Sequence, residues 1–178
     1  MNLTYVFLAG IDNSEPAHWQ SLWRGRVDRA VWVEHARWDQ PTCQAWLEDL
    51  ERAWDAIAGP KVVVAHSLGC LLFAEWCTKH RVNDVRSLLV AVPDVASPAF
   101  PRSAQGFHSA FELCVARPCR MVASRNDPFA SLTYARELAA CWGADLVDVG
   151  EKGHINLGSC LGSWEEGWQL VQAMCLER

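Results

Sequence analysis

Short apolar runs alternate along the chain with segments in which apolar residues recur at helical spacing. The runs are rich in β-branched and aromatic residues, which predicts strands. Loops that contain glycine or proline separate most of them, as expected for turns. The predicted strands cover residues 3–8, 30–33, 62–64, 85–92, 119–124 and 145–149.

Amphipathic helices are expected between these strands. Residues 43–57 carry a tryptophan-rich apolar face, and Thr42 before them is a typical N-cap. The regular alternation of strands and helices predicts a parallel sheet with helices on both faces and right-handed crossovers. Other helices are expected from Pro16 onward, directly after Ser67, over 129–142 and over 164–176.

The stretch 62–70 has the pattern of a nucleophile elbow, a strand and a helix joined by a tight turn with serine at its apex. Such a turn lifts the Ser67 hydroxyl out of the sheet, where a base can reach it. Gly69 leaves room in the crowded turn, and Ala65 stands where the usual G-x-S-x-G pattern has its first glycine. The simpler interpretation is that Ser67 only caps the following helix.

An elbow on the third strand marks the point where the strand order reverses. Together with the alternation it predicts a three-layer α/β fold with a six-stranded parallel sheet in the order 2-1-3-4-5-6, as in α/β-hydrolases. We expect residues 1–178 to form one domain of this fold. Segment 93–118 contains four prolines and is irregular; it could serve as a lid but is too short for a large cap domain.

Three candidate catalytic residues follow strands whose carboxyl ends should meet at one edge of the sheet. Ser67, Asp127 and His154 come after the third, fifth and sixth strands, in the chain order of α/β-hydrolases. In this hypothesis His154 takes the serine proton and Asp127 orients the imidazole. Two alternatives stay open: Asp127 only caps the next helix while Asp94, after the fourth strand, is the acid, and His154 is an ordinary loop residue.

The oxyanion that forms during acyl transfer needs backbone N–H donors. The Leu68 N–H, at the start of the helix after the elbow, and the Ile11 N–H, in the loop after the first strand, are the candidates. The substrate pocket is expected to include His18, Trp38 and Phe100, although His18 could instead only bond a backbone group. His66 is expected to point away from the substrate.

Charge and composition narrow the possible partners and the expected compartment. The net charge is −5 and lysine and arginine are scattered, which argues against nucleic acid as the main partner. The first residues lack the positive region of a signal peptide and no apolar run is long enough to span a membrane, so we expect a cytoplasmic protein without a membrane partner. The sequence does not identify a protein partner.

Eight cysteines lie in the chain without a C-x-x-C pair or a Cys/His cluster of zinc-binding spacing. We therefore expect no metal, and the proposed chemistry needs no cofactor. In a reducing compartment the eight thiols should be free.

Several stretches that together span nearly the whole chain carry a family pattern: 18–20, Trp23, 38–41, Trp46, 64–70, 124–128, 142–156 and Trp164. In combination they resemble the small serine hydrolases related to retinoblastoma-binding protein nine, a compact branch of the α/β-hydrolases. The resemblance implies Ser67, Asp127 and His154 as the triad, and a minimal α/β-hydrolase fold without a large cap. This chain has Ala9-Gly10-Ile11-Asp12 where family members often carry a glycine-rich P-G-N-G-type turn.

The sequence thus favours a hydrolase of small carboxylic esters or amides that works through an acyl-serine intermediate. Two alternatives stay open. One is an interaction protein that keeps the hydrolase fold, and the other is an acyltransferase or perhydrolase that uses the same triad with a different acceptor.

Overall fold

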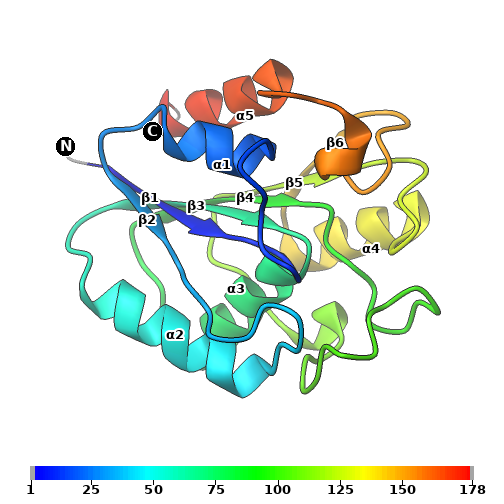
Figure 1. Ribbon diagram of the computed structural model, residues 1–178, viewed down its shortest axis with the longest axis horizontal. Helices are drawn as coiled ribbons and strands as arrows, with labels where there is room; N and C mark the ends of the chain where they lie inside the picture. The colour runs from blue at the N-terminus through cyan, green and yellow to red at the C-terminus, as the bar shows by residue number, and fades with distance from the viewer. Residues whose placement is uncertain (1–2, 177–178) are drawn as a thin grey trace.

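The computed structural model describes residues 3–176, which form a six-stranded parallel sheet with helices on both faces (Figure 1). The strand order is β2-β1-β3-β4-β5-β6, and every neighbouring pair is parallel, as predicted. The strands are β1 (Thr4–Leu8), β2 (Ala30–Trp32), β3 (Lys61–His66), β4 (Val85–Val90), β5 (Cys119–Ala123) and β6 (Asp145–Asp148).

The helices divide between the two faces of the sheet. Figure 1 shows α1 (Trp19–Arg24) and α5 (Glu165–Leu176) above the sheet. On the opposite face lie α2 (Cys43–Asp55), α3 (Leu68–Lys79) and α4 (Leu132–Trp142). Each face has its own apolar core, and β3 contributes to both because all six of its residues are buried. Burial on both faces explains the continuous apolar runs of the central strands.

Two helices begin later than the sequence predicts. Residues 15–18 form a turn closed by the bond from His18 N to Glu15 O, so α1 begins at Trp19 with His18 as its N-cap and not at Pro16. Helix α4 begins at Leu132 because the Ser131 side chain accepts a hydrogen bond from Tyr134 N. The start of each helix is therefore fixed by an N-cap side chain that accepts a backbone N–H, and not by the preceding proline.

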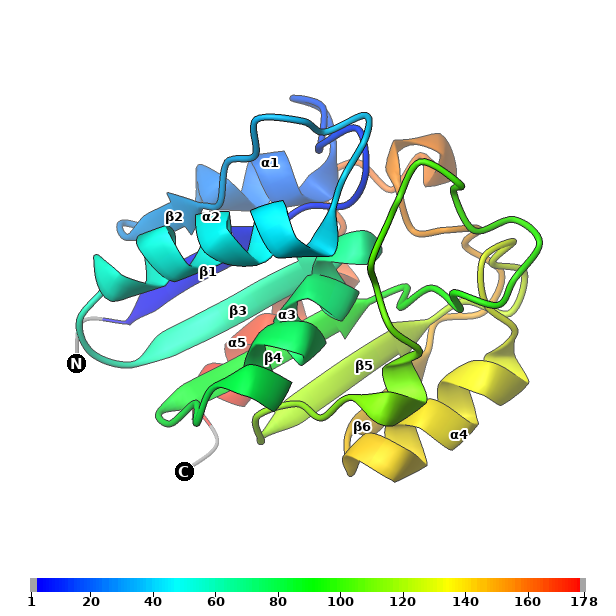
Figure 2. The same ribbon diagram turned by 90° about the horizontal axis from the view of Figure 1, so that it is seen from below.

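Strand β4 is two residues shorter than the predicted 85–92. Its ladder ends at Val90, and Ala91 has a φ of 56°, which takes the chain out of the extended conformation. The segment that follows, drawn in green in Figure 2, extends past the carboxyl end of the sheet before β5. Its helical content within the described residues is one 3₁₀ turn, Ala110–Glu112.

None of the helices between residues 3 and 176 is long and apolar enough to cross a membrane.

Candidate active site

Ser67 lies at the sharp turn between β3 and α3. Its φ of 54° and ψ of −124° belong to a strained conformation that non-glycine residues rarely adopt. The turn is close-packed: a Cβ on Gly69 would lie 2.4 Å from Leu8 O, and one on Gly10 would lie 2.9 Å from Ser67 Cβ. Local strain and the two glycine positions together describe a nucleophile elbow packed against the end of β1.

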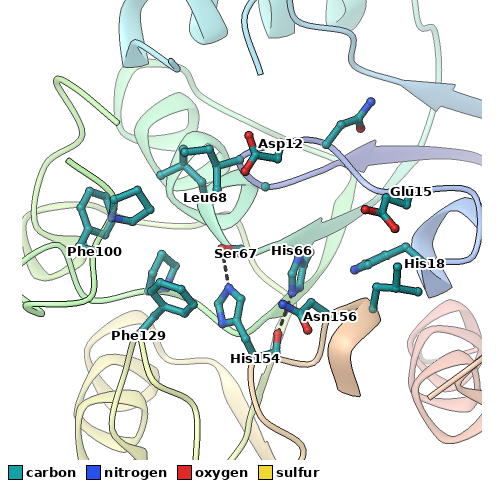
Figure 3. Close-up of a pocket in the computed structure, with 16 residues that line it drawn as sticks. Asp12, Glu15, His18, His66, Ser67, Leu68, Phe100, Phe129, His154 and Asn156 are labelled. Atoms are coloured by element: carbon teal, nitrogen blue, oxygen red, sulfur yellow. Dashed lines mark hydrogen bonds between the residues drawn. The ribbon is translucent and has the colours of Figure 1, made fainter. Parts of the chain in front are cut away.

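The structure brings the three predicted residues Ser67, Asp127 and His154 together. Figure 3 shows the hydrogen bond between Ser67 and His154. His154 Nε2 lies 2.7 Å from Ser67 Oγ, and His154 Nδ1 lies 2.9 Å from Asp127 Oδ2 and 3.0 Å from Asp127 Oδ1. The Asp127 carboxylate is an acceptor, so Nδ1 carries a proton and Nε2 of the neutral ring is free to accept from the serine. Ser67 and His154 are each 8% exposed.

The side chain of Asp94, the alternative acid, bonds its own turn and not His154 in the part of the chain that the structure describes. Its Oδ1 accepts from Ala96 N at 2.9 Å, which closes a local turn after β4. Asp127 does not cap α4, because Ser131 does. Asp127 Oδ1 instead accepts from Phe129 N at 2.9 Å, within its own turn. The acid next to His154 in the structure is therefore Asp127.

The two loops that carry Asp127 and His154 are tied to each other by side chains that the sequence analysis did not single out. Ser124 Oγ accepts from Lys152 N at 2.8 Å, and Asn126 Oδ1 accepts from Gly153 N at 2.7 Å. Ser124 Oγ also donates to Asn126 Oδ1. These bonds hold the loop before His154 against the end of β5 and so set the spacing between Asp127 and His154.

His66 and Trp19 support the histidine loop from the other side. His66 Nε2 donates to the backbone carbonyl of His154 at 2.9 Å, and Trp19 Nε1 donates to the carbonyl of Ile155 at 2.7 Å. His66 was expected to point away from the substrate, but it lines the cavity beside Ser67. Gln20 Nε2 donates to Leu8 O and Val64 O, both at 3.1 Å, and so links the ends of β1 and β3.

Both predicted oxyanion donors line the cavity beside Ser67. Leu68 is the first residue of α3, so its N–H has no acceptor within the helix. Ile11 lies in the turn after β1, where Asp12 N donates to Trp38 O and Asn13 N to Gly10 O. Within the described part of the chain the Ile11 N–H has no hydrogen-bond acceptor, so both groups remain available to a ligand.

The cavity at Ser67 has a volume of about 260 Å³. His18 and Phe100 line it, as predicted, and Phe129 packs against His154 with ring centroids 4.4 Å apart. Trp38 was the wrong choice, because its ring packs at 69° against the His35 ring, with centroids 4.8 Å apart, and is not among the described residues that line the cavity. Only its carbonyl reaches the site, through Asp12 N.

Burial favours the uncharged form of His18 and His66, the two histidines beside Ser67 and His154. Desolvation lowers the pKa of His18 to about 4, with a smaller contribution from the charge of His154. Desolvation also holds the pKa of His66 well below its ordinary value, with smaller contributions from His154 and His18. A neutral His66 has one N–H, and the carbonyl of His154 accepts it.

Among residues 3–176 no group of three or more histidine, cysteine, aspartate or glutamate side chains is arranged to hold a metal ion.

Residues 5–173 match the protein family described as serine hydrolase. The chain belongs to this family. Comparison with curated protein sequences finds no match. The family assignment therefore rests on a match that spans most of the chain and includes all three residues of the site.

Solved structures show the same fold. A YdeN-like hydrolase from Pectobacterium atrosepticum is 29% identical with a TM-score of 0.83, and the match covers 97% of this chain and 90% of that one. The ydeN gene product of B. subtilis is 20% identical with a TM-score of 0.81, covering 99% and 100%. Mouse alpha/beta hydrolase domain-containing protein 10 is 13% identical with a TM-score of 0.69, covering 96% and 87%. The α/β-hydrolase fold is thus confirmed, whereas the relation to retinoblastoma-binding protein nine stays a prediction.

Proposed function

We propose that this member of the serine hydrolase family cleaves small carboxylic esters or amides through an acyl-Ser67 intermediate, with His154 as base and Asp127 as the acid that orients it. The observation that carries the proposal is the placement of the His154 ring between Ser67 Oγ, at 2.7 Å, and the Asp127 carboxylate, at 2.9 Å. Both separations are hydrogen-bond distances, so His154 can take the proton of Ser67 while Asp127 holds the ring through Nδ1–H.

In the acylation step Ser67 Oγ attacks the substrate carbonyl carbon while its proton moves to His154 Nε2. The carbonyl oxygen becomes an oxyanion that accepts hydrogen bonds from the N–H groups of Leu68 and Ile11. The tetrahedral intermediate collapses, and the alcohol or amine leaves with the proton from the imidazolium. Asp127 stabilises that imidazolium through Nδ1–H.

Deacylation repeats the same steps with water. His154 takes a proton from a water molecule, the hydroxide attacks the acyl carbon, and the second tetrahedral intermediate releases the carboxylic acid. The proton on His154 returns to Ser67 Oγ. The proposal requires neither metal nor cofactor for this cycle.

A fluorophosphonate label with a p-nitrophenyl ester assay tests the proposal. The wild-type protein should be labelled at Ser67 and should hydrolyse the ester. Ser67→Ala and His154→Ala should each lose about 10⁶-fold in kcat, because the loss of the serine or the histidine of a triad costs about as much as the loss of the whole triad. Wild-type rates from a folded Ser67→Ala variant would exclude the mechanism.

The same assay separates the two alternatives. An interaction protein that only keeps the fold would remain unlabelled and inactive. An acyltransferase or perhydrolase would be labelled, but added alcohol or peroxide would divert most of the acyl group from water. Product analysis with and without these acceptors measures that partition.

A further inference from the structure

The walls of the cavity around Ser67 differ in chemistry from one side to the other. Phe100 and Phe129 lie on one side of Ser67, and Glu15, His18 and Asn156 lie on the other (Figure 3). We call the first side the apolar arm, formed by Pro93, Phe100, Pro101 and Phe129. We call the polar lining residues the polar arm: Glu15, His18 and Asn156 on the second side, Asp12 next to Leu68, and Asn13 (Figure 3).

The polar arm carries negative charge without a protein counter-ion. Asp12 and Glu15 are exposed side chains on the loop after β1, and both line the cavity. Neither carboxylate forms an ion pair or accepts a hydrogen bond within residues 3–176, and no described lysine or arginine lines the cavity. A ligand in this arm therefore meets two uncompensated carboxylates.

His18 adds an unused hydrogen-bond donor to the same arm. Its Nδ1 accepts the N–H of Gln20 at 3.2 Å, which places the proton of the neutral ring on Nε2. His18 is only 4% exposed, and Nε2 has no hydrogen-bond partner among the described residues. A buried donor without a partner is destabilising, so an acceptor atom on a ligand would be bound favourably there. The neutral ring also leaves the charge of the carboxylates unopposed.

We propose that the substrate has a positively charged group that binds in the polar arm, facing Asp12 and Glu15, and an apolar group that binds in the apolar arm. The inference rests on the proposed function, because the scissile carbonyl must lie between the arms at Ser67. An oxygen on the charged part of the substrate accepts from His18 Nε2–H. Substrates with a carboxylate at this position are disfavoured by like-charge repulsion.

Isosteric esters that differ only in charge test the proposal. Butyrylcholine and 3,3-dimethylbutyl butyrate place the charge or its neutral copy on the alcohol. The p-nitrophenyl esters of 4-(trimethylammonio)butyrate and 5,5-dimethylhexanoate place it on the acyl group. We expect the wild-type protein to prefer the cation in one pair by about 2- to 30-fold in kcat/KM, the range for two partly exposed ion pairs.

The Asp12→Asn/Glu15→Gln double variant should remove most of that preference. Glu51→Gln, on the exposed surface of α2, changes the net charge in the same direction away from the cavity and should leave the ratio unchanged. Added salt should lower the wild-type ratio, because the carboxylates are exposed. Equal or better turnover of the neutral isosteres in both pairs, or an unchanged ratio in the double variant, overturns the proposal.

His18 has a matched pair of variants. His18→Asn keeps an acceptor for Gln20 N but loses the donor at Nε2, and His18→Gln carries an amide N–H at about the reach of Nε2. The probe is a cationic ester with an added acceptor oxygen, 2-(2-trimethylammonioethoxy)ethyl butyrate on the alcohol side or p-nitrophenyl 3-hydroxy-4-(trimethylammonio)butyrate on the acyl side, whichever side the wild type prefers. We expect its KM to rise about 2- to 10-fold in His18→Asn, the range for one neutral hydrogen bond, and to recover in His18→Gln. Equal KM values in all three proteins would exclude His18 from substrate binding.

The four esters also distinguish failure of this proposal from failure of the proposed function. If the neutral esters are hydrolysed in a Ser67-dependent way and the cationic esters are not preferred, only the proposed cationic substrate class is wrong. A folded wild-type protein that hydrolyses none of the four esters removes both.

Discussion

His66 donates its Nε2–H to the backbone carbonyl of His154, so the residue directly before Ser67 holds the loop that carries the proposed base of Ser67. The two rings lie 5.0 Å apart between centroids, and His66 is buried. One short stretch of sequence thus supplies both the proposed nucleophile and a support for the proposed base.

Loss of this support should lower kcat more than it raises KM. We expect His66→Leu to reduce kcat on a p-nitrophenyl ester by about 10²-fold, because a misplacement of about 1 Å is enough for such a loss. His66→Gln keeps a donor at a similar reach and should recover most of the rate. A folded His66→Leu protein with wild-type kcat would contradict the positioning role.

The buried neutral histidines should make the protein less stable in mild acid. The pKa of His18 is about 4 in the folded protein, and its ordinary value is 6.5. Between these values the unfolded chain binds a proton at this residue that the folded protein does not bind. Stability therefore falls as the pH decreases from about 6.5 to 4, at about 1.4 kcal/mol per pH unit for each such group.

His18→Asn isolates this contribution, because asparagine is a good N-cap and does not titrate. Urea unfolding at pH 7 and pH 4.5 should show a smaller loss of stability in the variant, by on the order of 2 kcal/mol. The stability of the variant should still fall somewhat with decreasing pH, because desolvation lowers the pKa of His66 as well. The same loss in both proteins would show that His18 is protonated in the folded state.

Gly69 is predicted to be essential for stability as well as for the elbow. A Cβ at this position would lie 2.4 Å from Leu8 O and 2.7 Å from Ala9 O, both backbone atoms that cannot easily move. Gly69→Ala should destabilise the protein by about 1–3 kcal/mol in chemical denaturation. Gly25→Ala is the control: its φ is −75°, and the nearest atom to a new Cβ is 3.5 Å away. A stability change in Gly69→Ala as small as in Gly25→Ala would contradict the close packing of α3 on β1.

Thiol reactivity should follow burial. Cys114, Cys141 and Cys160 are exposed, whereas desolvation raises the pKa of Cys43 and Cys77 to about 12. A thiol reagent should modify the three exposed cysteines quickly in the native protein. All eight should react after denaturation without reductant if the chain contains no disulfide. A reproducible deficit of two thiols would indicate a disulfide.

The sequence could predict the fold because its signals are local. The apolar run at β3, the elbow pattern and the alternation of elements each depend on short stretches, and together they determine the strand order. The starts of α1 and α4 were missed because each depends on which side-chain acceptor bonds which N–H. Proline at a helix start is only a preference, and here His18 and Ser131 decide.

The hydrogen bonds that hold the site together could not be predicted from the sequence, for a different reason. Gln20 joins β1 to β3, and Asn126 joins two loops, through bonds between residues at least 12 positions apart. Nothing in the spacing of residues marks such long-range hydrogen bonds. Trp38 shows the opposite error, since a tryptophan near the expected site was assigned to the pocket although its partly buried ring packs against His35 and the core.

Asp127 and Asp94 provide the decisive comparison for the proposed acid. Both follow central strands, and both side chains accept a hydrogen bond from the N–H two residues ahead. Only Asp127 also bonds His154, and its side chain is 3% exposed. Substitution by asparagine preserves the size and the local turn at both positions, so the pair differs mainly in contact with the imidazole.

Asp127→Asn should therefore lower kcat/KM on one p-nitrophenyl ester by about 10⁴-fold, because an amide at this position favours the wrong tautomer of His154. Asp94→Asn should stay within about threefold of the wild type, because changes to exposed turns away from the reacting groups are usually small. Circular dichroism and unfolding curves would establish that both variants are folded. A large loss at position 94 with near-normal activity at position 127 would make Asp127 a turn residue and move the acid to β4.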